Sequence, residues 1–174
     1  MPARRHLLML GLTLPVLLAG CGGWEPLYAN RDTGPTDESL RSIKVGTIPE
    51  RVGQHLESGL RSSFNPSNVT VPQLYTLNVT VGTSVRSLGI QSQGIGTRGE
   101  VVLAATYRLV ENRTGKVVQT GTINANDSFD IQANGYSTIV AQDDAYARCV
   151  EDVRREIVAR LTLFLHDLKA SAPS

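Results

Sequence analysis

The sequence has 174 residues, with 17 Lys and Arg against 16 Asp and Glu, so its formal net charge is +1 at neutral pH. A chain of this length corresponds to one domain with a sizeable hydrophobic core. The near balance of charges excludes a protein that holds nucleic acid through a general basic field.

A short apolar run leads to the first cysteine. Arg4 and Arg5 form a basic segment, and Leu7 to Leu18 have the length of a signal-peptide apolar region, about 7–15 residues. This run is too short to span a bilayer, which needs about 20 residues. The sequence Leu18-Ala19-Gly20-Cys21 follows the pattern of a lipoprotein signal. We therefore expect residues 1–20 to be a signal peptide and Cys21 to carry covalent lipid such as palmitate. An ordinary secretory signal that ends beside a cysteine is the alternative.

Residues 21–40 are predicted to form a lipidated tether, because Gly, Pro, Asn and acidic residues are frequent in this range. Trp24 and Tyr28 interrupt the polar character, and these rings suit either docking on the domain or the membrane interface. Residues 41–169 are predicted to form a single domain, and residues 170–174 a frayed tail.

The domain is expected to open with a strand and a helix. Residues 41–48 alternate apolar and polar side chains, which indicates a strand. Pro49 suits the first turn of a helix, and Val52, Leu56, Leu60 and Phe64 recur every fourth residue after it.

Three longer strands are predicted next, over residues 74–86, 97–111 and 116–129. Residues 87–96 contain much Gly, Ser and Gln, and they predict a flexible connection. Residues 112–115 predict a hairpin turn in which Gly115 adopts positive φ.

The last element is predicted to be a long helix that starts near Ser137 and ends near Lys169. Its expected apolar stripe consists of Tyr146, Val150, Val153, Ile157, Leu161, Phe164 and Leu168. Charged residues such as Arg154 and Arg160 are expected on the opposite, solvated face. The order of elements predicts an α+β fold of two layers, in which two helices cover one mixed or antiparallel four-stranded sheet.

No residue pattern predicts a catalytic or metal site. His55 and His166 lack ligands at the right spacing, and Asp143 and Asp144 point apart on a helix. The segment 94–99 resembles a dinucleotide fingerprint but precedes a strand, so it is rejected. Cys149 is expected to be a small buried hydrophobe. We therefore expect no enzyme, no metal and no cofactor apart from the lipid on Cys21; a lipid-tethered hydrolase is the competing class.

Basic residues on the long strands and their connections are the candidates for binding. Arg and Lys at strand ends suit phosphate groups, Arg through its bidentate fork. A solvated sheet edge that discourages aggregation is the alternative interpretation. The candidates for contact with a phosphate group or a partner are Arg86, Arg98, Arg113 and Lys116.

Several short motifs in the expected order resemble the LptE family of lipopolysaccharide-assembly lipoproteins, in its alphaproteobacterial form. The opening Cys21-Gly22 with Trp24-Glu25-Pro26-Leu27-Tyr28 is similar to the family's CGFxPLY, with Gly23 as an insertion. Tyr107-Arg108-Leu109-Val110 followed by Thr114-Gly115-Lys116-Val117 is similar to its Y-x-L and T-G-x-V hairpin. Tyr136 and Ala141-Gln142-Asp143-Asp144-Ala145 then lead into the terminal helix.

The resemblance implies an outer-membrane lipoprotein, anchored by lipid on the periplasmic side, that plugs the β-barrel protein LptD. It implies help with barrel assembly and with delivery of lipopolysaccharide, and Arg98 is the first candidate contact by its position. No nucleic acid is expected as a partner. The alternative is an auxiliary lipoprotein of an ABC-type lipid transport system that faces the periplasm.

Overall fold

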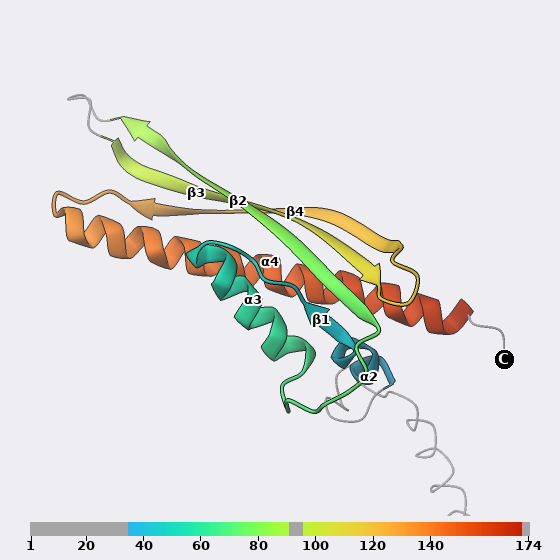
Figure 1. Cartoon of the computed structure of the whole chain (residues 1–174). Helices are drawn as coiled ribbons and strands as arrows, with labels where there is room; N and C mark the ends of the chain where they lie inside the picture. The colour runs from blue at the N-terminus through green and yellow to red at the C-terminus, as the bar shows by residue number, and fades with distance from the viewer. Residues whose placement is uncertain (1–34, 91–95, 172–174) are drawn as a thin grey trace, which may run out of the picture. The chain divides into compact units, whose positions relative to one another are not determined.

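The computed structural model describes residues 35–90 and 96–171 (Figure 1). Its elements are α2 (Pro35–Arg41), β1 (Ile43–Val45), α3 (Arg51–Phe64), β2 (Tyr75–Ile90), β3 (Gly96–Glu111), β4 (Val117–Asp130) and α4 (Gly135–Ser171). The signal peptide, Cys21, Trp24 and Tyr28 lie outside the described residues. The helix α2 begins within the range assigned to the tether, and its Leu40 is buried.

The four strands form one mixed sheet in the order β1-β2-β3-β4. The strand β1 runs parallel to β2, whereas β2, β3 and β4 form an antiparallel meander. Figure 1 shows both long helices on one face of this sheet, with α4 along β3 and β4 and α3 beside α4 and β1. The predicted two-layer α+β fold is confirmed.

The strand β1 is much shorter than the predicted strand over residues 41–48. Its last ladder bond joins the Gly46 N–H to the Leu77 carbonyl oxygen at 2.8 Å. Ile48 then turns inward and is fully buried, and its N–H donates to Glu57 of α3 at 2.9 Å. The alternating pattern therefore continues through Ile48 because that side chain enters the core, although the backbone has already left the sheet.

The hairpin that joins β2 to β3 is longer than the sequence pattern predicts. Residues Ser87 to Ile90, assigned to a flexible connection, continue β2 with irregular register opposite β3. Polar and glycine residues can still pair in a ladder when the neighbouring strand supplies the hydrogen bonds, so composition alone misplaced this boundary. At the other end, Gly115 has φ of 70°, which confirms the predicted turn between β3 and β4.

The core lies between the helices and the sheet face that they cover. Leu103, Ala105 and Leu109 of β3 are fully buried against this layer. Two aromatic rings fill space beside glycines on adjacent strands, because Tyr107 pairs with Gly121 and Phe129 with Gly99. A Cβ on Gly121 would lie 2.7 Å from the Tyr107 hydroxyl oxygen, so the close approach of this ring requires glycine.

The stripe of α4 that enters the core contains the predicted Val150, Val153, Ile157 and Leu161 but differs from the prediction at its other positions. Its buried residues are Ala145, Cys149, Val150, Val153, Ile157, Leu161 and Leu165. Tyr146 and Phe164 are only partly buried, and Leu168 is exposed. The predicted pattern favours large side chains, whereas small ones at Ala145 and Cys149 suit a helix that lies close to a sheet.

Candidate functional surface

The sheet face opposite the helices is covered by no element of the described part of the chain (Figure 1). Strand alternation places the even-numbered residues of β2, β3 and β4 on this open face. Thr80, Thr106 and Thr122 form a row across the three strands, and the hydroxyls of Thr106 and Thr122 lie 3.2 Å apart. All three are exposed, so the open face presents hydroxyl and amide groups to whatever contacts it.

A polar cluster lies on the open face towards the hairpin between β2 and β3. Glu100 is nearly buried, forms an ion pair with Arg86 of β2, and accepts a hydrogen bond from Asn126 of β4 at 2.7 Å. The hydrogen bond from Arg86 is the main cause that lowers the pKa of Glu100, so this carboxyl group stays ionised at neutral pH. Arg98 donates to Ser128 of β4 at 2.9 Å. The cluster fixes one negative and two positive groups on neighbouring strands.

Glu100 was not among the candidate binding residues predicted from the sequence, although strand alternation already indicates its place beside them. It is a carboxylate that strand alternation places on the same face as Arg86 and Arg98. Because opposite charges on neighbouring strands commonly pair, this alternation could have indicated the cluster before the register was known.

The four basic candidates do not form one site. Arg86 and Arg98 lie on the open face near the β2–β3 hairpin, and both are exposed. Arg113 and Lys116 lie in the turn between β3 and β4, roughly 40 Å away along the strands. Arg113 approaches Glu111 at 3.7 Å. Any single ligand of ordinary size contacts one pair and not the other.

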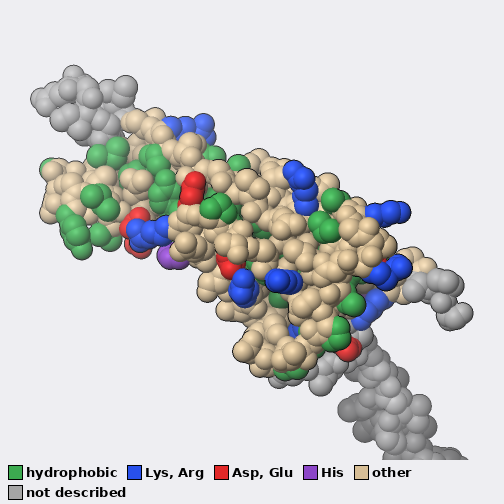
Figure 2. Space-filling view, viewed as in Figure 1, with side chains coloured by type: hydrophobic (Ala, Val, Ile, Leu, Met, Phe, Trp, Pro, Cys, Tyr) green, Lys and Arg blue, Asp and Glu red, His purple; other side chains and the backbone are tan. Residues whose placement is uncertain are grey.

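Large apolar side chains are exposed at the end of the molecule where α4 begins. We call this the apolar patch; its members are Val85, Leu88, Tyr136, Ile139 and Val140. Tyr136 is the most exposed of them, at 75%. Hydrophobic side chains gather at this end in Figure 2. Exposed apolar groups that cluster in this way are typical of surfaces that bind a partner or lipid.

The charged side chains of α4 are less uniformly solvated than the sequence predicts. Arg154 is half-buried and donates to Ser63 of α3, while Arg148 forms an ion pair with Asp127 of β4. Arg160 pairs with Glu156 and donates to the Thr122 carbonyl oxygen at 3.4 Å. These contacts attach α4 to both of its neighbours, whereas Arg155 pairs only with Asp152 of the same helix.

The remaining side chains that could react or bind a metal ion are dispersed over the described residues. Cys149 is buried, and burial raises the pKa of its thiol to about 11. His55 and His166 are exposed, and Asp143 pairs with Arg51 of α3 at 3.3 Å. In residues 35–90 and 96–171, no group of three His, Cys, Asp or Glu is arranged to hold a metal ion. No described helix is both long and apolar enough to span a bilayer.

Comparison with protein families gives one match for this sequence. The profile of the LptE lipopolysaccharide-assembly family matches residues 40–161, which extend from the end of α2 through most of α4. The chain belongs to this family. The matched range contains the whole sheet and therefore the open face, and the resemblance predicted from sequence is confirmed. No match was found among curated proteins.

Solved structures share the fold of this LptE-family chain. A protein of Caulobacter crescentus described as a lipoprotein is 22% identical over 81% of this chain and 100% of its own, with a TM-score of 0.63. A minor lipoprotein of Acinetobacter baumannii is 16% identical over 70% of this chain and 91% of its own, with a TM-score of 0.50. Lipoprotein B of Nitrosomonas europaea is 15% identical over 71% of this chain and 82% of its own, also with a TM-score of 0.50.

Proposed function

We propose that this protein is an outer-membrane lipoprotein that occupies the lumen of the LptD β-barrel, assists barrel assembly and helps to deliver lipopolysaccharide to the outer leaflet. Membership of the lipopolysaccharide-assembly family supports the general role. The open face is the observation that carries the finer proposal, because it is a broad sheet surface with a row of exposed hydroxyl groups that the described residues leave uncovered.

A barrel lumen is a suitable counterpart for such a surface. The interior of an outer-membrane barrel is polar, because inward-facing residues alternate with lipid-facing ones along each strand. The row formed by Thr80, Thr106 and Thr122 offers hydroxyl groups that can donate to and accept from those inward residues. These side chains already lie on a paired sheet, so little backbone freedom is lost when the partner binds.

The apolar patch supports a second contact at the end of the molecule. Tyr136, Ile139 and Val140 are exposed in the first turns of α4, beyond the part of the helix that packs in the core. A surface of this kind suits an apolar segment of the barrel protein or the acyl chains of its lipid cargo. The protein would then act by binding alone, without a catalytic group.

Co-purification of the barrel tests the proposal. The tagged full chain should retain LptD when the outer membrane is solubilised in mild detergent. Thr106→Arg should reduce the recovered barrel at least tenfold, because a bulky charge at the centre of the open face costs more than about 1.4 kcal/mol of binding energy. Ala147→Arg introduces the same side chain at an exposed site on α4 and should leave recovery unchanged.

Two results would contradict this. If abundant wild-type protein brings no barrel with it, the plug assignment fails and the role of an auxiliary lipoprotein in lipid transport should replace it. If Thr106→Arg and Ala147→Arg lower recovery equally, the barrel does not contact the open face selectively.

Arg98 is proposed as a contact for lipopolysaccharide or for the barrel. Replacing it with glutamate should weaken association with lipopolysaccharide about tenfold, because a side chain that can donate to phosphate oxygens is exchanged for one that repels them. Arg155→Glu is the control, since Arg155 is exposed on α4 and pairs within its own helix. Binding of labelled lipopolysaccharide to the purified full chain measures both variants, and equal losses would remove Arg98 from the contact surface.

A further inference from the structure

A recess lies along the outer edge of β1 and includes no residue of the apolar patch. It has a volume of about 590 Å³ and is formed by the end of α2, β1, the end of α3 and the loop after α3. Three of the residues that line it are basic, namely Arg41, Lys44 and Arg61. No described lining residue is acidic. We call it the basic recess. Its volume lies within the range of small-molecule sites, about 300–1,000 Å³.

The positive charges of Arg61 and Lys44 are only partly neutralised by the described residues around them. Arg61 pairs with Glu57 at 2.7 Å, yet its side chain remains 58% exposed. Lys44 is exposed and takes part in no ion pair with the described residues. Ser62 and Asn68 add a hydroxyl and an amide to the same lining. Lys44 and Arg61 therefore bring two positive charges to the recess against the one negative charge of Glu57, together with neutral hydrogen-bonding groups.

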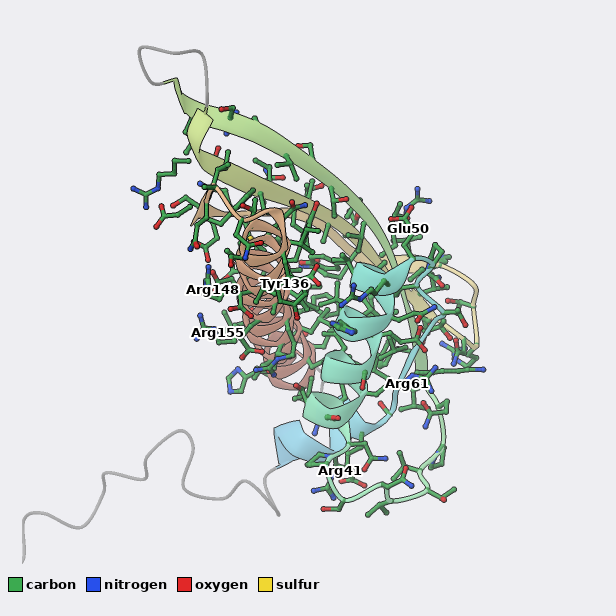
Figure 3. All side chains as sticks on the ribbon, turned by 90° about the vertical axis from the view of Figure 1, so that its left-hand side faces the viewer. Arg41, Glu50, Arg61, Tyr136, Arg148 and Arg155 are labelled. Carbon is green, nitrogen blue, oxygen red and sulfur yellow. The ribbon has the colours of Figure 1, made fainter. Side chains whose placement is uncertain are left out.

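Figure 3 shows Arg41 and Arg61 at the same side of the molecule, on α2 and α3, whereas Arg148 and Arg155 lie along α4. In Figure 2, basic side chains are also frequent at the end opposite the apolar patch. Arg113 and Lys116 contribute there, because the Asn112 N–H bonds to the Leu74 carbonyl oxygen and so places the β3–β4 turn beside the start of β2. The recess is thus part of a basic end of the domain.

We propose that the basic recess binds the phosphate of an anionic glycerophospholipid headgroup. Arginine and lysine bind phosphate in different ways. A guanidinium group can donate hydrogen bonds to two phosphate oxygens at once, and an ammonium group attracts phosphate as a point charge. The choice of a lipid rests on the lipid attachment at Cys21 that was proposed above. Cys21 precedes Pro35 by 14 positions, which set an upper limit of about 50 Å on the distance between them.

The headgroups of the leaflet that holds the anchor are therefore the phosphate groups within reach of Arg41, which ends α2. A basic site that adds to a lipid anchor strengthens attachment to an anionic membrane surface and orients the domain on it. The apolar patch at the opposite end would then point away from the anchoring leaflet. This role is independent of contact with a barrel.

The test uses the full processed chain in neutral detergent micelles, with no barrel protein present. Dihexanoyl phosphatidylglycerol, dihexanoyl phosphatidylcholine, inorganic phosphate and lipid A are added in separate titrations. Backbone amide chemical shifts of residues 41–45 and 61–68 report binding. We expect saturable shifts with phosphatidylglycerol, about fivefold weaker affinity for Lys44→Ala, and retained affinity for Lys44→Arg. Arg155→Ala removes the same charge elsewhere and should leave the affinity unchanged.

Several outcomes would overturn the proposal. Equal affinity for phosphatidylcholine, or equal losses for Lys44→Ala and Arg155→Ala, would show that no specific phosphate site exists. Saturation by inorganic phosphate at a lower concentration than phosphatidylglycerol would assign the recess to a free anion, and tighter binding of lipid A would assign it to lipopolysaccharide. Because the barrel is absent from this assay, its failure leaves the co-purification test of the proposed function unaffected.

Discussion

Replacing Leu161 with alanine is expected to lower the free energy of unfolding by about 2–5 kcal/mol. Leu161 is fully buried on the stripe of α4 that packs against the sheet. Alanine removes several methyl and methylene groups from this interface, and the rigid sheet can close only part of the cavity that they leave. Chemical denaturation of the purified wild-type and variant proteins measures the loss of unfolding free energy as a shift of the unfolding midpoint.

Leu163 provides a matched control two residues away on the same helix. Its side chain is 64% exposed, so Leu163→Ala makes the same chemical change without leaving a core cavity. We expect it to cost less than about 0.5 kcal/mol, since alanine is also the better helix former. Similar losses for the two variants would show that the face of α4 assigned to the core is wrong.

Replacing Cys21 with serine is expected to abolish lipid attachment completely. Serine lacks the thiol to which the proposed lipid would be joined, so the precursor should keep residues 1–20 and lack fatty acid. The variant should therefore have a higher polypeptide mass than the mature chain and incorporate no labelled palmitate. Mass spectrometry of the purified protein and palmitate labelling in cells measure these two effects.

Cys149→Ser is the control for this experiment. Cys149 is buried in α4 and its raised thiol pKa keeps it protonated at neutral pH, so it is a poor candidate for modification. This variant should be processed and labelled as the wild type is, although the buried hydroxyl will lower its stability. Normal processing of Cys21→Ser, or loss of label from Cys149→Ser, would contradict the assignment of the lipid to Cys21.

Most of the fold could be predicted from sequence because its patterns are long. The strands around Leu77 and Leu103 alternate over many residues, and the turn at Gly115 has specific backbone chemistry, so both were predictable from local patterns. The end of β1 was not, since Ile48 follows the strand pattern while its backbone has left the ladder. A local pattern reports burial of a side chain, whatever the backbone around it does.

The candidate surface was only partly predictable, for a different reason. The polarity of one strand face was evident from Thr80 and its neighbours, but the absence of a second layer over that face follows from where α3 and α4 pack. The basic recess could not be predicted from the sequence, because Arg41, Lys44 and Arg61 come from three different elements. Each of them alone resembles an ordinary solvated charge. Sites assembled from distant segments require the tertiary structure.

The position of α4 at the end of the chain also determines when the core can form. The strands β2, β3 and β4 can pair early as local hairpins, since each follows the last along the sequence. Their apolar side, which includes Leu103 and Leu109, lacks the cover of α4 until residues 135–171 have been synthesised, and among the described strands α3 by itself packs only against β1 and β2. A growing or truncated chain that stops after Asp130 is therefore an exposed, aggregation-prone sheet and not a smaller stable domain.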